Sequence, residues 1–293
     1  MPRRAFTLVE LLAVMGVIFM LIGLLMPAIQ KVRAAADRLR CASQLHQLGI
    51  ALHLYHNDYG VLPSGVTPNR PGVPYPSLGW QARLLPYLEQ ESAWRQIEQA
   101  YRQDRLPFNN PPHEYFSRPM RLFGCPADER VHEPQYARGR YFVALTSYVG
   151  VLGSSWDKPD GCLYLNSRVK LTDIHDGTSN TIVVGERPPS PDFWYGWWYA
   201  SVGVAGTGSP DLLLGGKENN PFGSYIPGCP LGPYVFAKGK VDNMCDTFHF
   251  WSLHPSGAHF LLADGSAQFL NYGAAPLIPA LCTRSGGEVV EWP

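Results

Sequence analysis

The chain has 293 residues, with 24 basic and 24 acidic side chains, so its formal net charge is zero. Nucleic-acid-binding proteins usually present a basic face, and this balance argues against that class. Charged residues make up only 16% of the chain, while 27 prolines and 29 glycines predict long loops within one large domain or two.

The first predicted element is a long helix that begins in an apolar run, Phe6–Ala28. The run has a single charge, Glu10, and it meets the roughly 20 residues that a membrane-spanning helix needs. A second interpretation is a secretory signal peptide cleaved at the small residues Ala34–Ala36. The apolar core of such a signal has about 7–15 residues, and this run is longer. A plain anchor would leave Glu10 unexplained, since a carboxylate inside a bilayer costs roughly 2.5–3.5 kcal/mol. The basic residues on the two flanks do not decide the orientation: Arg3, Arg4, Lys31, Arg33, Arg38 and Arg40.

A third interpretation, processing, accounts for Glu10. The segment Phe6–Glu10, FTLVE, resembles the processing site of type IV pilins and type II secretion pseudopilins. The resemblance implies that a prepilin peptidase removes residues 1–5, cuts between Ala5 and Phe6, and methylates the new amine. It also implies that Glu10 stays buried and pairs with the Phe6 amine of a neighbouring subunit. The family usually has glycine where this chain has Ala5, so cleavage is expected to be slower.

The helix is expected to continue to Tyr59 and to change character after Pro27. Its second half, within residues 29–60, is amphipathic and is predicted to pack on a globular domain formed by residues 61–293. His46 and His53 share a face, which we interpret as solvated, because no carboxylate or cysteine completes a metal site. The apolar stripe recurs at spacings of three and four residues: Val32, Ala35, Leu39, Ala42, Leu45, Leu48, Leu52 and Tyr55.

Several later motifs, in order, resemble blocks of a large bacterial group of prepilin-like proteins. The resemblance implies an α+β, pilin-like fold, with the long N-terminal helix packed on an antiparallel β-sheet that has long loops. The sequence pattern itself predicts strands near 141–149, 181–185 and 193–200, and a glycine-rich excursion over 203–228. The matching blocks are Cys41–Pro63, Trp80–Gln90, Cys125–Asp128, Leu171–Glu186 and a His-x9-Asp-Gly signature at His254–Gly265.

The His-x9-Asp-Gly signature is predicted to form a structural hairpin. Two strand-like runs flank Asp264-Gly265, which suits a two-residue type I′ turn in which both residues have positive φ. His254 is expected to hydrogen-bond within the turn region. An enzyme built on His254 and Asp264 is the alternative, but the sequence offers no nucleophile or metal set to complete it.

Six cysteines can form disulfides outside the cytoplasm. No pair has the Cys-x-x-Cys spacing of a structural zinc site. The predicted pairs are Cys229–Cys245, Cys41–Cys125 and Cys162–Cys282. Asp173, Asp176 and Asn180 form a weak calcium candidate, for which backbone hydrogen bonding in a turn is the preferred interpretation. No cofactor is predicted.

These observations predict a structural subunit rather than an enzyme, anchored once in a membrane. The resemblance implies that this is the bacterial cytoplasmic membrane and that the globular part lies outside. The expected partners are prepilin peptidase, the membrane, and other pilin-like subunits or a secretion machinery of type II or pilus character. The alternative function is a membrane-anchored extracytoplasmic binding module or enzyme that uses the aromatic segment or the C-terminal histidine.

Overall fold

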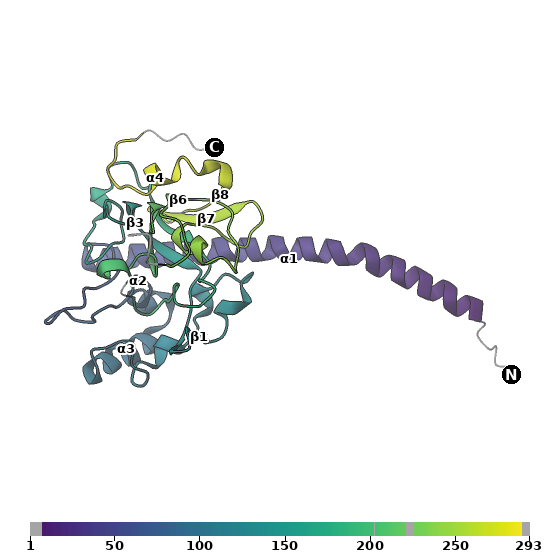
Figure 1. Ribbon diagram of the computed structural model, residues 1–293, viewed down its shortest axis with the longest axis horizontal. Coiled ribbons are helices and arrows are strands. Elements are labelled where there is room, and N and C mark those ends of the chain that lie inside the picture. Colours follow the sequence, from purple (N-terminus) through teal and green to yellow (C-terminus); the bar gives the residue numbers. More distant parts are fainter. Residues whose placement is uncertain (1–7, 202, 221–225, 289–293) are drawn as a thin grey trace.

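The long N-terminal helix dominates the molecule. A computed structural model describes residues 8–201, 203–220 and 226–288. In it α1 (Leu8–Tyr59) is a continuous helix of 52 residues that passes through Pro27. Figure 1 shows the first half of α1 projecting away from the globular part and the second half running against it. The helix ends where Gly60 adopts a positive φ of 69°, as the glycine and the following proline predict.

The globular part is built on a curled, mixed β-sheet, so the predicted α+β class is confirmed. The strand order is β6-β5-β3-β4-β7-β8, and β3 and β5 run parallel while the other neighbours are antiparallel. The prediction of a purely antiparallel sheet is therefore wrong for this pair. Parallel neighbours need a long crossover connection, and residues 156–212 provide one. The strands are β3 (Tyr148–Ser155), β4 (Ile182–Glu186), β5 (Leu213–Glu218), β6 (Tyr234–Val235), β7 (Gly257–Leu262) and β8 (Ala267–Asn271); β1 (Gln135–Ala137) and β2 (Tyr141–Val143) pair separately.

Helices cover the two faces of the main sheet. The second half of α1 packs on β7 and β8 with a core that includes Leu45, Leu48 and Leu261. On the other face, Ile278 and Leu281 of α4 (Ile278–Leu281) join a second core beneath β3 and β5. The remaining α-helices are α2 (Trp80–Arg83) and α3 (Glu91–Gln103), separated by a 3-10 turn that contains Pro86. That turn is Leu85–Leu88, and further 3-10 turns among the described residues are Glu114–Ser117, Arg121–Phe123, Glu129–Val131, Leu171–Asp173, Val204–Gly206, Met244–Phe248 and Tyr272–Ala274.

Three segments differ from the sequence prediction. The single strand predicted near 141–149 is two strands, β2 and the start of β3, which belong to separate sheets. Residues 193–200 form no strand and contribute only isolated bridges, Leu145 with Trp197 and Leu78 with Ala200. The glycine-rich segment 203–228 is more than an excursion, because it contains β5. A side chain at Gly215 would meet the Ser155 backbone at 2.6 Å, and one at Gly216 would meet Pro279 Cα at 2.7 Å. The glycines therefore allow β3 and α4 to approach β5 closely.

A buried carboxyl at the end of β5 makes the fold sensitive to pH. Glu218 is 1% exposed and accepts hydrogen bonds from the Ser209 hydroxyl at 2.9 Å and the Gly215 amide at 2.6 Å. Burial raises its pKa from 4.5 to about 8, against the smaller opposing effect of those hydrogen bonds. The folded protein therefore holds this proton more tightly than the unfolded chain does.

Glu218→Gln is expected to stabilise the protein at pH 8 and to flatten its stability profile. The contribution of the buried, protonated Glu218 to the free energy of unfolding is fully present below the pKa of 4.5 in the unfolded chain. It is lost as the pH rises toward the pKa of about 8 in the folded protein. Thermal unfolding between pH 4 and 9 should show a falling midpoint in the wild type that the variant lacks. Glu129→Gln, at an exposed glutamate, is the matched control. Parallel pH profiles for the wild type and Glu218→Gln would contradict this assignment.

Candidate functional site

The first half of α1 is an exposed apolar rod. Among the described residues, α1 is the helix that is long and apolar enough to cross a membrane. Its most apolar stretch is not buried against the rest of the protein. Residues such as Leu12, Phe19 and Leu24 are more than half exposed. Glu10 lies in this segment, while the predicted cleavage residues Ala5 and Phe6 lie outside the described residues. The chain thus carries a single-pass membrane anchor.

Cys41 is the first residue along α1 that the globular domain buries completely. One turn before it, the Arg38 guanidinium lies 3.4 Å from the centre of the Phe269 ring. One turn after it, Gln44 accepts a 2.7 Å hydrogen bond from the Tyr148 hydroxyl and donates one of 2.8 Å to the Arg121 carbonyl. These contacts fix the helix where it joins the domain.

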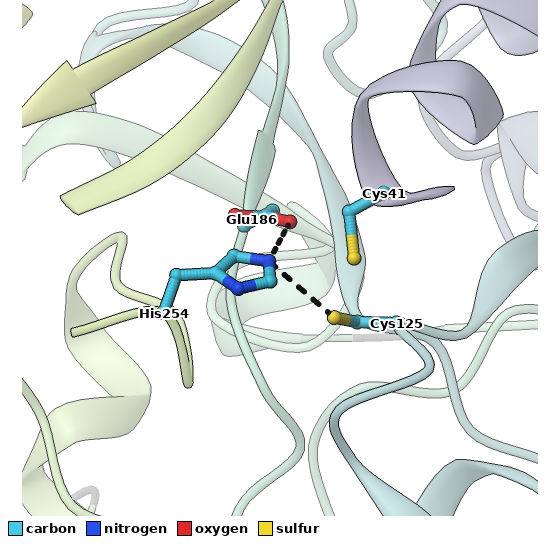
Figure 2. A group of neighbouring side chains, drawn as sticks. All are labelled: Cys41, Cys125, Glu186 and His254. Carbon is cyan, nitrogen blue, oxygen red and sulfur yellow. Dashed lines mark hydrogen bonds and ion pairs between the residues drawn. The ribbon is translucent and has the colours of Figure 1, made fainter. Parts of the chain in front are cut away.

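Beneath this junction lies a cluster of four side chains from four distant segments, Cys41, Cys125, Glu186 and His254 (Figure 2). Their sulfur, nitrogen and oxygen atoms all lie within 4.8 Å of one another. His254 Nε2 lies 3.7 Å from Cys125 Sγ and 3.5 Å from Glu186 Oε1. The residues are between 0% and 4% exposed. We call this set the Cys–His–Glu cluster.

The local structure explains how each side chain reaches the cluster. Cys41 continues the buried stripe of α1, and Glu186 ends β4, whose residues are all buried. Cys125 follows the 3-10 turn Arg121–Phe123, and its amide donates to the buried Ser147 hydroxyl at 3.0 Å. The His254 amide donates to the Ser252 hydroxyl at 3.0 Å, which fixes the bend before β7.

Electrostatics within the cluster favour the charged forms of Glu186 and His254. Burial alone would raise the pKa of Glu186, but hydrogen bonds and charges from His254 and His259 outweigh it and lower that pKa to about 2. Burial lowers the pKa of His254, yet its contacts with Cys125 and Glu186 raise it to about 10. The hydrogen bond between the thiols raises the pKa of Cys41 and lowers that of Cys125. At neutral pH Glu186 and His254 therefore form a buried ion pair.

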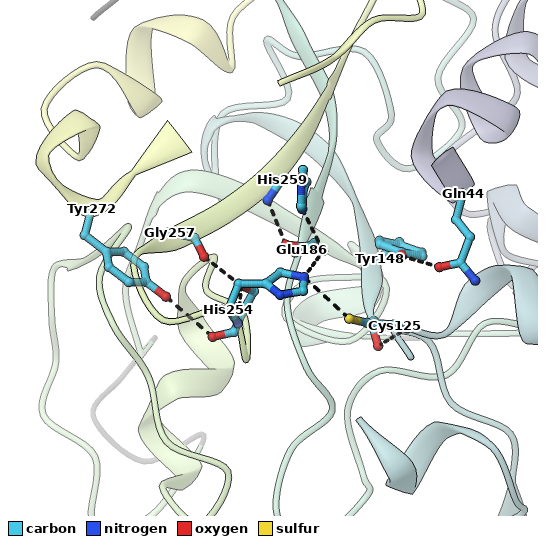
Figure 3. Close-up of polar contacts among 10 residues, drawn as sticks. Gln44, Cys125, Tyr148, Glu186, His254, Gly257, His259 and Tyr272 are labelled. Atoms are coloured by element: carbon cyan, nitrogen blue, oxygen red, sulfur yellow. Dashed lines mark hydrogen bonds and ion pairs between the residues drawn. The ribbon is translucent and has the colours of Figure 1, made fainter. Parts of the chain in front are cut away.

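His259 of β7 contacts the Glu186 carboxylate, while Cys125 contacts the ring of His254 (Figure 3). Its amide donates to Glu186 Oε2 at 2.7 Å, and its ring Nδ1 lies 3.3 Å from Oε1. The Glu186 carboxylate therefore has a fixed orientation, with Oε1 turned toward both histidines.

A groove of about 830 Å³ reaches His254 from the surface. Asp37 and Arg40 of α1 line one side, and Pro126 and His132 line the other.

A thiol, an imidazole and a carboxylate in contact can bind a metal, and two neighbouring thiols can be oxidised to a disulfide. A nucleophilic role would need an accessible sulfur, and Cys125 is only 4% exposed.

The hairpin prediction is confirmed in its strands but wrong in its turn. β7 and β8 pair in register, yet the connection has three residues, Ala263–Gly265, and Leu262 donates to the Ser266 carbonyl at 2.9 Å. Gly265 has a φ of 88°, whereas Asp264 does not have positive φ, so the turn is not type I′. A three-residue loop with glycine in the left-handed region is the alternative hairpin connection. The expected bond of His254 within the turn is also wrong, because its ring lies in the Cys–His–Glu cluster.

The turn is instead a docking point for α1. His46 Nδ1 lies 2.9 Å from the Gly265 carbonyl, and His53 Nε2 lies 2.9 Å from the Ala263 carbonyl. Both histidines therefore hold the hairpin. The predicted solvated face is confirmed for His46, which is exposed, but is wrong in part for His53, which is half-buried. A side chain at Gly49 would meet Gly265 Cα at 2.9 Å, so glycine at both positions permits the contact. The Asp264 carboxylate bonds Ser266 within the turn, whereas the His254 ring contacts Cys125 and Glu186, so the structure does not bring together the pair on which the alternative enzyme interpretation was built.

Gly265→Val is expected to destabilise the protein by about 1–3 kcal/mol, because a β-branched residue opposes positive φ. Asp264→Asn should change stability by less than about 0.5 kcal/mol. The exposed Asp264 carboxylate accepts from the Ser266 amide at 2.8 Å, and an asparagine oxygen can do the same. Chemical denaturation of both variants measures the difference. Equal stabilities would contradict the assigned turn.

The calcium candidates do not form a ligand set. The Asp176 carboxylate accepts from the Gly286 and Gly287 amides at 2.7 and 2.8 Å. Asp173 accepts from the Lys170 amide at 2.8 Å, and the Asn180 side chain donates to the Asp176 backbone carbonyl. The side chains bond the backbone, as the preferred interpretation of this segment predicts.

One of the three predicted disulfides is confirmed, Cys229–Cys245. The other four cysteines are free thiols, so the other two predicted pairs are not formed in the structure. Cys162 packs in the core on the α1 side of the sheet and Cys282 in the core on the α4 side. The Cys41 and Cys125 sulfurs lie within 4.8 Å of each other without a covalent bond.

The aromatic segment 193–200 mostly packs in the core, with Trp198 and Tyr199 fully buried. At its start, Trp194 and Trp197 line a hollow of about 300 Å³ together with Tyr141 and Phe108. These rings contact one another edge to face, which is how aromatic side chains fill a core.

Comparison with known proteins gives a family. A family model described as "Protein of unknown function (DUF1559)" matches residues 30–276. No curated protein and no solved structure matches the chain.

Proposed function

Because the chain belongs to the prepilin-like family described as protein of unknown function (DUF1559), we propose that it is a pilin-like structural subunit that is processed, anchored and assembled or displayed. In this proposal prepilin peptidase cuts between Ala5 and Phe6 and methylates the Phe6 amine. The mature chain spans the cytoplasmic membrane once, with its globular domain on the outer side. No catalytic role is assigned.

The observation that carries the proposal is the division of α1 into two halves. Residues 8–28 are exposed and apolar apart from Glu10, and the buried residues of α1 lie between Cys41 and Leu52, where the helix joins the core of the domain. A helix that is apolar all round belongs in lipid or against other apolar helices. An exposed apolar helix fixed to a globular domain suits a subunit of an assembly. In such an assembly the helices of several subunits pack together and their globular domains face outward.

Photo-crosslinking in native membranes tests this function. A photo-reactive residue at Leu21, in the exposed apolar half of α1, should capture copies of this chain or other pilin-like proteins. The same residue at the exposed Leu106, on a loop of the domain, is the matched control and should not. Adducts to lipid alone at Leu21, in a chain that is correctly inserted, would contradict assembly through this helix.

A further inference from the structure

The Cys–His–Glu cluster has the dimensions of an empty tetrahedral metal site. Zinc bonds of about 2.3 Å to sulfur and about 2.0–2.2 Å to nitrogen and oxygen place neighbouring ligand atoms roughly 3.4–3.8 Å apart. His254 Nε2 lies 3.7 Å from Cys125 Sγ and 3.5 Å from Glu186 Oε1, and the Cys41 sulfur completes a set within 4.8 Å. The four side chains come from four segments that are distant in the sequence. A shared ion would link these segments to one another.

We propose that Cys41, Cys125, Glu186 and His254 bind one Zn²⁺ ion, which fastens the anchor helix to the globular domain. Two soft thiolates with one imidazole and one carboxylate suit zinc and do not suit calcium or magnesium, which prefer oxygen ligands. With four protein ligands the site is closed, as structural zinc sites are, and leaves no position for a substrate. The site goes beyond the proposed function and does not depend on processing or assembly.

The surroundings fit a metal site in two further respects. Metal ligands are usually oriented by hydrogen bonds from a second layer of residues, and His259 holds the Glu186 carboxylate through its amide and its ring. The groove that His254 lines offers an approach from the surface to one of the four ligands. Binding would replace the thiol protons and the Nε2 proton of the His254 imidazolium, so zinc uptake should release protons and weaken as the pH falls.

The position of Cys41 explains what the ion would do. Cys41 is where α1 passes from its exposed half into the domain, and its three partners belong to the domain. An ion shared among them would resist the pull that a membrane-held helix exerts on the domain. A role in anchoring, rather than chemistry, follows from the closed ligand set.

Titration of the full-length protein in detergent tests the proposal. The reduced, metal-free protein is titrated with Co²⁺ and then with Zn²⁺. One Co²⁺ per chain should bind with the intense visible bands of tetrahedral cobalt and thiolate charge-transfer absorption, and one equivalent of Zn²⁺ should remove both signals. Cys41→Ser, Cys125→Ser and His254→Gln should abolish these signals. Cys162→Ser and Cys282→Ser, at buried thiols outside the cluster, are the matched controls and should retain them.

Two further measurements keep the test decisive if a cluster variant fails to fold. In the wild type, Zn²⁺ should protect Cys41 and Cys125 from alkylation and leave the reactivity of Cys162 and Cys282 unchanged. His259→Gln should keep the stoichiometry while weakening Zn²⁺ affinity about 10–100-fold, the usual effect of losing a residue that orients a ligand. Absent or octahedral cobalt binding, or a Cys41–Cys125 disulfide in the protein isolated from its native membrane, would overturn the zinc site.

Discussion

Glu10→Val is expected to leave membrane insertion intact and to reduce the assembled fraction by at least ~100-fold, which corresponds to about 3 kcal/mol lost per buried ion pair. The substitution removes a carboxylate that costs roughly 2.5–3.5 kcal/mol within a bilayer, so insertion itself should become easier. In our account the pairing of Glu10 with the methylated amine of a neighbouring subunit offsets this cost.

Insertion and assembly can be read separately for this variant. Membrane fractionation reports insertion, gel mobility reports processing, and the fraction released by shear reports assembly. Leu11→Val, at the next position of the same apolar segment, is the matched control and should assemble normally. Normal assembly of Glu10→Val would remove the charge-pairing argument.

The second large effect is expected from Glu186→Ala, which should lower the free energy of unfolding by about 3–5 kcal/mol. Glu186 is 1% exposed, and its carboxylate contacts the rings of His254 and His259 as well as the His259 amide. Removing it leaves the buried amide without its acceptor and His254 without its counter-charge. The loss is expected with or without a bound ion.

Denaturant unfolding of the full-length protein in detergent measures this effect. Glu133→Ala, at an exposed glutamate, is the control and should stay within about 0.5 kcal/mol of the wild type. A loss below about 1 kcal/mol for Glu186→Ala would mean that the carboxylate does not hold the histidines as described.

The long helix and the hairpin strands were predictable because their signals are local. An apolar run followed by a stripe defines α1, and alternating residues around Asp264-Gly265 define β7 and β8. The turn type was not predictable in the same way. The Asp-Gly pair fits two connections, and packing of Gly265 against Gly49 favours the one with a three-residue loop.

The Cys–His–Glu cluster was hidden because its four members lie far apart in the chain. The sequence analysis grouped His254 with Asp264, its partner in the signature, whereas the fold brings it to Glu186 and Cys125. One signal was present: Glu186 ends an otherwise apolar buried strand, where a carboxylate needs a partner. β5 was missed for a different reason, because its glycines predict a loop and in fact allow close packing.

Mass spectrometry of the mature N-terminus, on protein isolated from its native membrane, tests the central claim most directly. The account predicts that residues 1–5 are absent and that the first peptide begins at Phe6 with a methylated amine. A first peptide that begins at Met1 or Pro2, or one that begins after a cut at Ala34–Ala36, would contradict the assignment of this chain as a processed pilin-like subunit.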